Sequence, residues 1–179
     1  MLFGHSLGAY ASTAVLKYNH KVAAVVAASG FDDPKEQWKY SVKKSTSFLG
    51  ALLEPYAGIY IDMKFGDEAH LSAVDGINSI DVPILVISGT DNEYYGGESK
   101  IYERKGKITN TNCVFLLMDE LNHSGHYDYF LTNEAVKYQK QVKNFQITKI
   151  DKALYLEHDE TIMKNINDFF LKAIDGESV

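Results

Sequence analysis

The residues with the clearest chemical potential lie at the start of the chain, in the stretch Gly4-His5-Ser6-Leu7-Gly8. A Gly-x-Ser-x-Gly stretch followed by a helix is typical of a nucleophile elbow, in which a strand turns sharply into a helix with serine at the bend. Glycine has no Cβ, so Gly4 and Gly8 are expected to leave room for that turn. The backbone N–H of Leu7 would then point toward the oxyanion that forms when Ser6 attacks a carbonyl carbon. The alternative is a serine that only caps the helix.

Serine is a weak nucleophile and needs a general base within hydrogen-bond reach, together with a group that orients that base. Asp91 and His126 each follow an apolar, strand-like run, and they are the predicted orienting acid and base. His123 competes with His126 because it lies closer to the end of its run. The glycine before His126 and the helix-like pattern after it favour His126. Glu93 is the second choice for the acid.

The stretch from His123 to Asp128 also contains metal-ligating residue types. Gly125 within it argues against a rigid helical pair of ligands, and the sequence places no third ligand. We therefore expect neither a metal nor a cofactor.

The elements that must position these side chains alternate between strands and helices. Three continuously apolar runs predict strands buried on both faces of a parallel sheet: 22–28, 82–88 and 114–118. Helical spacing predicts helices over 7–18 and 133–142, and a final helix that Asp159 caps, with an apolar stripe formed by Ile162, Met163, Ile166, Phe169, Phe170 and Ile174. The pattern predicts an α/β fold with a mostly parallel sheet and flanking helices. In such sheets functional groups gather beyond the carboxyl ends of the strands, which Ser6, Asp91 and His126 all follow.

The segment from about 32 to 66 lacks strand alternation and is rich in aromatic residues. We expect a small lid above the sheet, with an ordinary pair of connecting helices as the alternative. Within it, the apolar run 48–53 predicts a short helix closed by Glu54-Pro55. The aromatic side chains would line an acyl or alcohol pocket, or only cover the core.

Composition narrows the class of protein. A chain of 179 residues is long enough for one domain with a sizeable core, and we expect a single domain over 1–179. The net charge of −6 argues against nucleic acid or an anionic membrane surface as a partner. The single cysteine, Cys113, excludes an internal disulfide and favours a reducing, cytoplasmic location. No apolar run approaches the roughly 18 residues that span a bilayer.

At these points the chain resembles the α/β-hydrolases. The chain order Ser6, Asp91, His126 is the order of their catalytic residues. The apolar strand led by Pro83 before the acid and the Gly-His pair at His126 are also similar to the family. One departure is the acid turn, which in the family is commonly Gly-x-x-Asp, whereas Gly89-Thr90-Asp91 is one residue shorter.

The resemblance implies a serine hydrolase, esterase- or lipase-like (EC 3.1.1), that cleaves a small-molecule ester or similar acyl bond through an acyl-enzyme. It covers only the C-terminal part of the family's fold, so we expect an N-terminally truncated chain that begins at its elbow strand. The loop that supplies the second oxyanion-hole donor in the family lies among the strands before the elbow. The alternative is an inactive remnant that acts as a binding module. An exposed sheet edge would favour a homo-oligomer or a complementing N-terminal segment.

Overall fold

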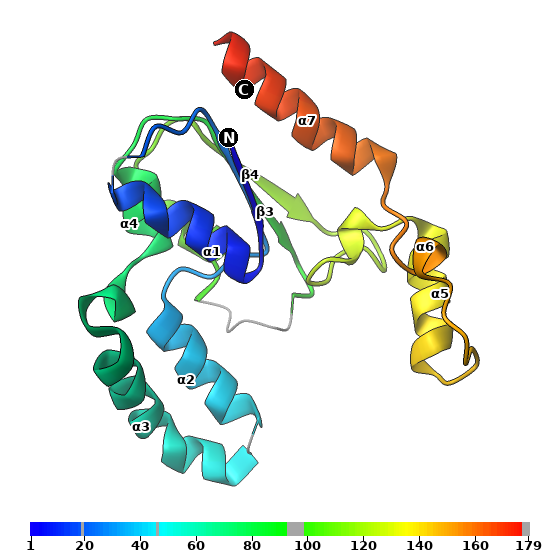
Figure 1. The fold of residues 1–179 in the computed structure, drawn as a ribbon, viewed down its shortest axis with the longest axis horizontal. Helices are drawn as coiled ribbons and strands as arrows, with labels where there is room; N and C mark the ends of the chain where they lie inside the picture. The colour runs from blue at the N-terminus through cyan, green and yellow to red at the C-terminus, as the bar shows by residue number, and fades with distance from the viewer. Residues whose placement is uncertain (19, 46, 93–98, 177–179) are drawn as a thin grey trace.

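The computed structural model describes residues 1–18, 20–45, 47–92 and 99–176, with only the backbone described at 47–49 and 51 (Figure 1). Its strands are β1 (Leu2–His5), β2 (Val25–Ala28), β3 (Ile84–Gly89) and β4 (Cys113–Met118). Its α-helices are α1 (Leu7–Ala14), α2 (Pro34–Ser45), α3 (Ser47–Phe65), α4 (Ala73–Asn78), α5 (Asn133–Lys143), α6 (Lys152–Tyr155) and α7 (Glu160–Asp175). Short 3-10 helices include η1 (Val15–Tyr18), η2 (Gly66–His70), η4 (Tyr102–Lys107) and η5 (Asp128–Phe130).

The four strands form a parallel sheet in the order β1-β2-β3-β4. The α/β class, the parallel sheet and the flanking helices predicted from the sequence are therefore confirmed. The register pairs the last residue of β1 with Ala28, Ala28 with Ile87, and Gly89 with Met118, so all four strands end at the same edge of the sheet. β1 lies at one side of the sheet, and the side chain of Phe3 on it is 50% exposed.

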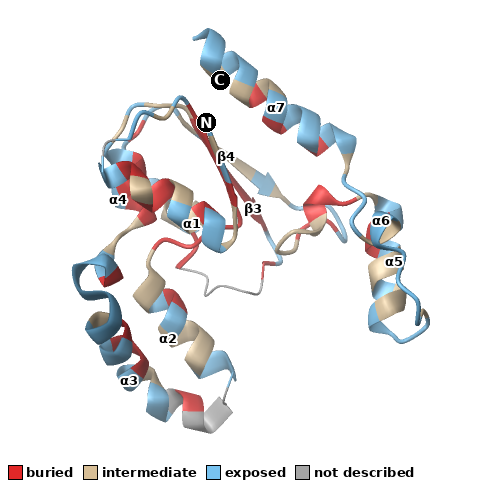
Figure 2. Cartoon of the chain, in the orientation of Figure 1, coloured by how far each residue is buried: buried red, intermediate tan, exposed pale blue. Residues whose placement is uncertain are grey.

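Alternate residues of the central strands build two cores, one on each face of the sheet. Val25, Ile84 and Val86 pack on one face, against η1 and α4. Val26, Leu85 and Ile87 pack on the other face, against α7. Figure 2 shows these strands as almost wholly buried. Burial on both faces explains why their sequences are continuously apolar rather than alternating.

The segment expected to be a lid forms a helical hairpin of α2 and α3 that extends away from the sheet (Figure 1). The expected short helix closed at Pro55 is wrong, because α3 continues through Pro55 to Phe65. Salt bridges join the two helices, from Lys35 to Asp62 and from Lys39 to Glu54. These ion pairs join the two helices along the hairpin.

Four of the described aromatic residues of the hairpin are exposed rather than part of the core. Tyr56 is 65% exposed and Tyr60 is 50% exposed, and Trp38 and Phe65 are similar. The base of the hairpin is fixed instead by Asp32, which is buried and accepts hydrogen bonds from Val74 N and from the Arg104 guanidinium. Across the residues that the structure describes, no helix is both long and apolar enough to cross a membrane.

Candidate active site

Ser6 lies at the junction of β1 and α1 in an unusual backbone conformation. Its φ of 60° and ψ of −119° place it in a region that residues with a Cβ rarely occupy. Ser6 N donates to Ala28 O at 2.9 Å, which anchors the end of β1 to β2, while Ser6 O accepts from Ala9 N at 3.1 Å in the first turn of the helix. Its side chain makes no capping hydrogen bond to α1. The strained turn therefore does not use the hydroxyl as a helix cap.

The two glycines of the motif have different roles. A Cβ at Gly4 would lie 2.1 Å from Gly8 O and 2.6 Å from Ala9 N, both backbone atoms. Only glycine fits at position 4, as the sequence predicts. A Cβ at Gly8 would meet nothing within 4 Å, so the expectation that Gly8 also makes room for the turn is wrong. The tight contact is therefore between Cα of Gly4 on the strand and the backbone of the first turn of α1.

His126 lies on the loop after β4, beside the end of β1. The Nε2 atom of His5 lies 3.0 Å from His126 O, and the centroids of the two imidazole rings are 4.7 Å apart. His5 is thus packed directly against the histidine predicted to be the base, next to the predicted nucleophile, Ser6. Burial lowers the pKa of His126 from 6.5 to about 4, and electrostatic repulsion by the neighbouring His5 adds to this shift. At neutral pH the His126 imidazole is uncharged.

The Nδ1 atom of His126 lies 3.0 Å from the side-chain oxygen of Asn92, which is 3% exposed. Asn92 was not among the residues selected from the sequence. The signal was present, because Gly89-Thr90-Asp91-Asn92 has the Gly-x-x spacing of the acid turn with an amide at its last position. A prediction that requires a carboxylate selects Asp91, one residue before Asn92.

Asp91, the predicted acid, is exposed, and its carboxylate accepts a hydrogen bond from Ser124 Oγ at 2.5 Å. Asp91 N also donates to Ser124 O at 2.7 Å. The structure thus places Asp91 beside the loop that carries His126, while Nδ1 of the His126 ring lies within hydrogen-bond distance of the neighbouring Asn92. The fallback acid, Glu93, lies outside the described residues.

His123, the competing base, is buried with both ring nitrogens engaged locally. Nδ1 lies 3.0 Å from Asp128 O, and Nε2 lies 3.0 Å from the side-chain oxygen of Asn133 at the start of α5. These contacts tie the loop after β4 to α5. Within the described ranges, no group of three His, Cys, Asp or Glu side chains is placed to hold a metal ion.

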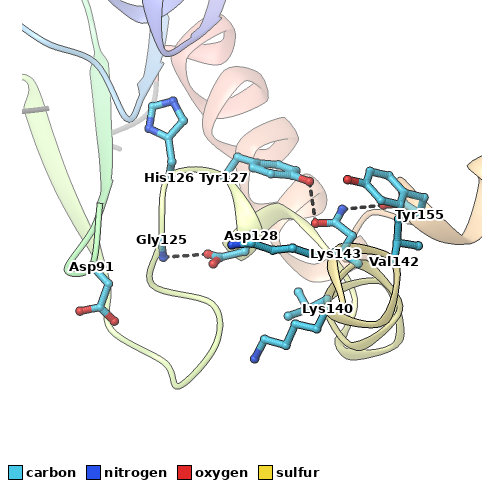
Figure 3. A pocket seen from close by; sticks show the side chains of 11 residues that line it. Asp91, Gly125, His126, Tyr127, Asp128, Lys140, Val142, Lys143 and Tyr155 are labelled. Atoms are coloured by element: carbon cyan, nitrogen blue, oxygen red, sulfur yellow. Dashed lines mark hydrogen bonds between the residues drawn. The ribbon is translucent and has the colours of Figure 1, made fainter. Parts of the chain in front are cut away.

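A cavity of about 520 Å³ opens beside His126 (Figure 3). The loop that carries Asp91 and the loop that carries His126 form one side, and α5 forms the other. Two lysines of α5, Lys140 and Lys143, line it together with Tyr155 of α6. The cavity therefore combines an apolar wall with both signs of charge next to the histidine.

Comparison with solved structures identifies the fold. An esterase of Pyrococcus furiosus, Pf2001, superposes with a TM-score of 0.53 at 16% identity over 95% of this chain and 52% of its own. The 2,6-dihydroxy-pseudo-oxynicotine hydrolase gives 0.55 at 15% identity over 99% of this chain and 41% of its own. Acetyl xylan esterase 1 from Thermoanaerobacterium sp. JW/SL YS485 gives 0.54 at 13% identity over 96% of this chain and 44% of its own. The fold is that of the α/β-hydrolases.

The chain, with its α/β-hydrolase fold, spans about half or less of the length of those three proteins. No protein-family model and no curated protein sequence matches the chain. The likeness is thus one of structure at low sequence identity, and it establishes how the chain folds. The likeness does not by itself assign a reaction or a substrate to the chain.

Proposed function

We propose that the chain is a serine hydrolase of the esterase or lipase-like class (EC 3.1.1), which cleaves a carboxylic ester or similar acyl bond through an acyl-enzyme. The observation that carries this proposal is the backbone of Ser6. A residue held at positive φ between a strand and a helix costs on the order of 1–3 kcal/mol, and such strain is retained where it serves a site. The α/β-hydrolase fold supports the proposal, because its nucleophile lies on a turn of this kind.

The proposed reaction begins with attack of Ser6 Oγ on the carbonyl carbon, while its proton passes to Nε2 of His126. The negative charge moves to the carbonyl oxygen, and the N–H of Leu7 donates to it, since the first N–H groups of a helix have no partner within the helix. When the bond to the leaving alcohol breaks, His126 returns the proton to the alcohol oxygen. Water then releases the acid by the same steps.

The cavity beside His126 is the proposed place for one part of the substrate. Its volume of about 520 Å³ lies within the range of ordinary small-molecule sites. A small ester is therefore the substrate class that fits best.

Labelling with a fluorophosphonate probe tests the proposal directly, since an activated serine displaces fluoride from the probe and becomes phosphonylated. We expect the purified chain to be labelled, and His126→Ala to lose on the order of 100-fold or more in labelling rate because the base is removed. His123→Ala is the matched control, because His123 is bonded to Asp128 and Asn133 instead. Equal labelling of the wild type and His126→Ala would overturn the assignment of the base.

The pH dependence of hydrolysis gives a second test. A general base must be unprotonated, and the pKa of His126 lies at about 4 instead of 6.5. We expect kcat/KM to stay level as the pH falls from 7 to 5 and to drop only near pH 4. A profile that falls with an apparent pKa near 6.5, in a chain that remains folded, would contradict the lowered pKa of the buried His126 imidazole.

The second candidate function, binding without turnover, is favoured by the position of β1 at the side of the sheet and by the exposure of Phe3 on it. A second copy of the chain or a complementing N-terminal segment would cover this edge. A chain that is folded by circular dichroism but resists the probe, alone and at high concentration, would favour this candidate. Labelling that rises steeply with protein concentration would instead favour an active oligomer.

A further inference from the structure

The turn after β3 holds His126 through a neutral amide. The Asn92 side-chain oxygen lies 3.0 Å from His126 Nδ1. An amide oxygen can only accept a hydrogen bond, so Nδ1 carries the hydrogen and Nε2 carries the lone pair. Nε2 is the nitrogen that must take the proton of Ser6. Asn92 thereby sets the tautomer that the proposed reaction needs.

The carboxylate of Asp91, the residue before Asn92, bonds to Ser124. The backbone N–H and the side chain of Asp91 both bond to Ser124, at 2.7 and 2.5 Å. Gly89 lies so close to this loop that a Cβ on it would be 2.1 Å from Ser124 O. Asn92 N approaches Gly89 O at 3.4 Å and closes the turn. With Asp91 directed to Ser124, the next side chain is directed to His126.

We infer that Asn92, and not Asp91, is the residue that positions His126, and that Asp91 clamps the turn after β3 to the loop after β4. This inference rests on the proposed function and adds to Ser6 and His126 the residue that orients the base. Asn92 acts through the imidazole and does not touch the substrate, so it is a positioning residue.

A neutral amide changes what happens when His126 takes a proton. His5 of β1 packs against the ring. The other charged or titratable residues that line the same cavity are Asp91, Tyr127, Asp128, Lys140, Lys143 and Tyr155. Asp91 is exposed and bonded to Ser124, and Asp128 accepts from a backbone N–H. The hydrogen bond described at Nδ1 of His126 is the one to the Asn92 amide oxygen. An amide stabilises an imidazolium less than a carboxylate at the same place would, so this partner favours the uncharged base.

The test compares kcat/KM for p-nitrophenyl acetate against pH in three variants. Asn92→Ala should lose on the order of 100-fold in kcat, because the ring is no longer held in place. Asn92→Asp should keep most of the activity and move the acid limb upward by about 1–3 pH units, because a carboxylate stabilises the imidazolium. Asp91→Asn is the matched control, and its acid limb should stay at the wild-type position. An acid limb that moves with Asp91→Asn and not with Asn92→Asp would overturn the inference.

A measurement without substrate separates this inference from the proposed function. The ¹⁵N NMR signals of the His126 ring in the wild type should show hydrogen on Nδ1 and none on Nε2 at pH 7, and Asn92→Ala should give a mixture of tautomers. If the probe fails to label the wild type but this pattern is present, the proposed function fails and the positioning role of Asn92 stands. Hydrogen on Nε2 in the wild type, or an unchanged pattern in Asn92→Ala, would overturn the role.

Discussion

Replacement of Ser6 with alanine is expected to abolish ester hydrolysis and to leave the protein folded. Removal of the nucleophile of a serine hydrolase lowers kcat on the order of 10⁴-fold or more, because the acyl-enzyme can no longer form. The fold should tolerate the change, since the Ser6 side chain does not cap α1 and alanine meets the same backbone strain as serine. We expect a change of about 0.5 kcal/mol or less in the free energy of unfolding.

The measurement is initial rate on a short-chain p-nitrophenyl ester, together with thermal unfolding by circular dichroism. Ser12→Ala is the matched control: Ser12 lies on the same helix, and its hydroxyl donates to Ala9 O within that helix. The control should hydrolyse the ester at the wild-type rate. Turnover by Ser6→Ala at that rate would remove Ser6 from the mechanism. Loss of the folded state in Ser6→Ala would show that the hydroxyl is structural.

The two central strands were predictable because burial on both faces produces continuously apolar runs in the sequence. The third run also forms a strand, β4, but the expected burial on both faces is wrong there, since its residues are partly buried or exposed. The expected run 82–88 becomes β3 at Ile84–Gly89, and the run 22–28 contains β2 at Val25–Ala28. The cap of the last helix was predictable for a local reason, since Asp159 accepts from Thr161 N and Ile162 N. In each case the deciding interaction lies within the element or repeats along it.

The hairpin was harder to predict because contacts between segments decide it. In α2, Gln37 is the buried side chain, so the helix has no apolar stripe that its sequence could reveal. Lys35 bonds to Asp62, 27 positions away, and such a pair leaves no periodic signal. Proline usually ends a helix, yet α3 continues through Pro55, and α3 is joined to α2 by these ion pairs.

The candidate site shows the same division. The motif predicted the strained turn at Ser6 from nearby residues alone. The partner of the imidazole depends on which side of a tight turn faces the loop after β4, and Asp91 and Asn92 differ by one position there. One hydrogen bond to Ser124 decides which of the two adjacent side chains faces the histidine. A sequence without that contact favours the carboxylate on charge alone.

The glycines of the elbow give the second large prediction, and they provide their own control. Gly4→Ala would place a methyl group 2.1 Å from Gly8 O and 2.3 Å from Gly8 C, and both atoms are backbone. The strand and the helix must separate to accept it, at a cost of about 1–3 kcal/mol or more. Because Ser6 lies between them, a shift of about 1 Å should also cost on the order of 100-fold in labelling or turnover.

Gly8→Ala makes the same chemical change four residues along, where a methyl group meets nothing within 4 Å. Alanine is the better helix residue by about 1 kcal/mol, so this variant should be as stable as the wild type or more stable, with unchanged labelling. Thermal unfolding and the fluorophosphonate rate, measured on both variants, test the pair together. If Gly4→Ala matches Gly8→Ala in both measurements, the close contact between β1 and α1 does not hold the serine in place. If only Gly4→Ala loses labelling while still folded, the close contact between β1 and α1 is what positions Ser6 for attack.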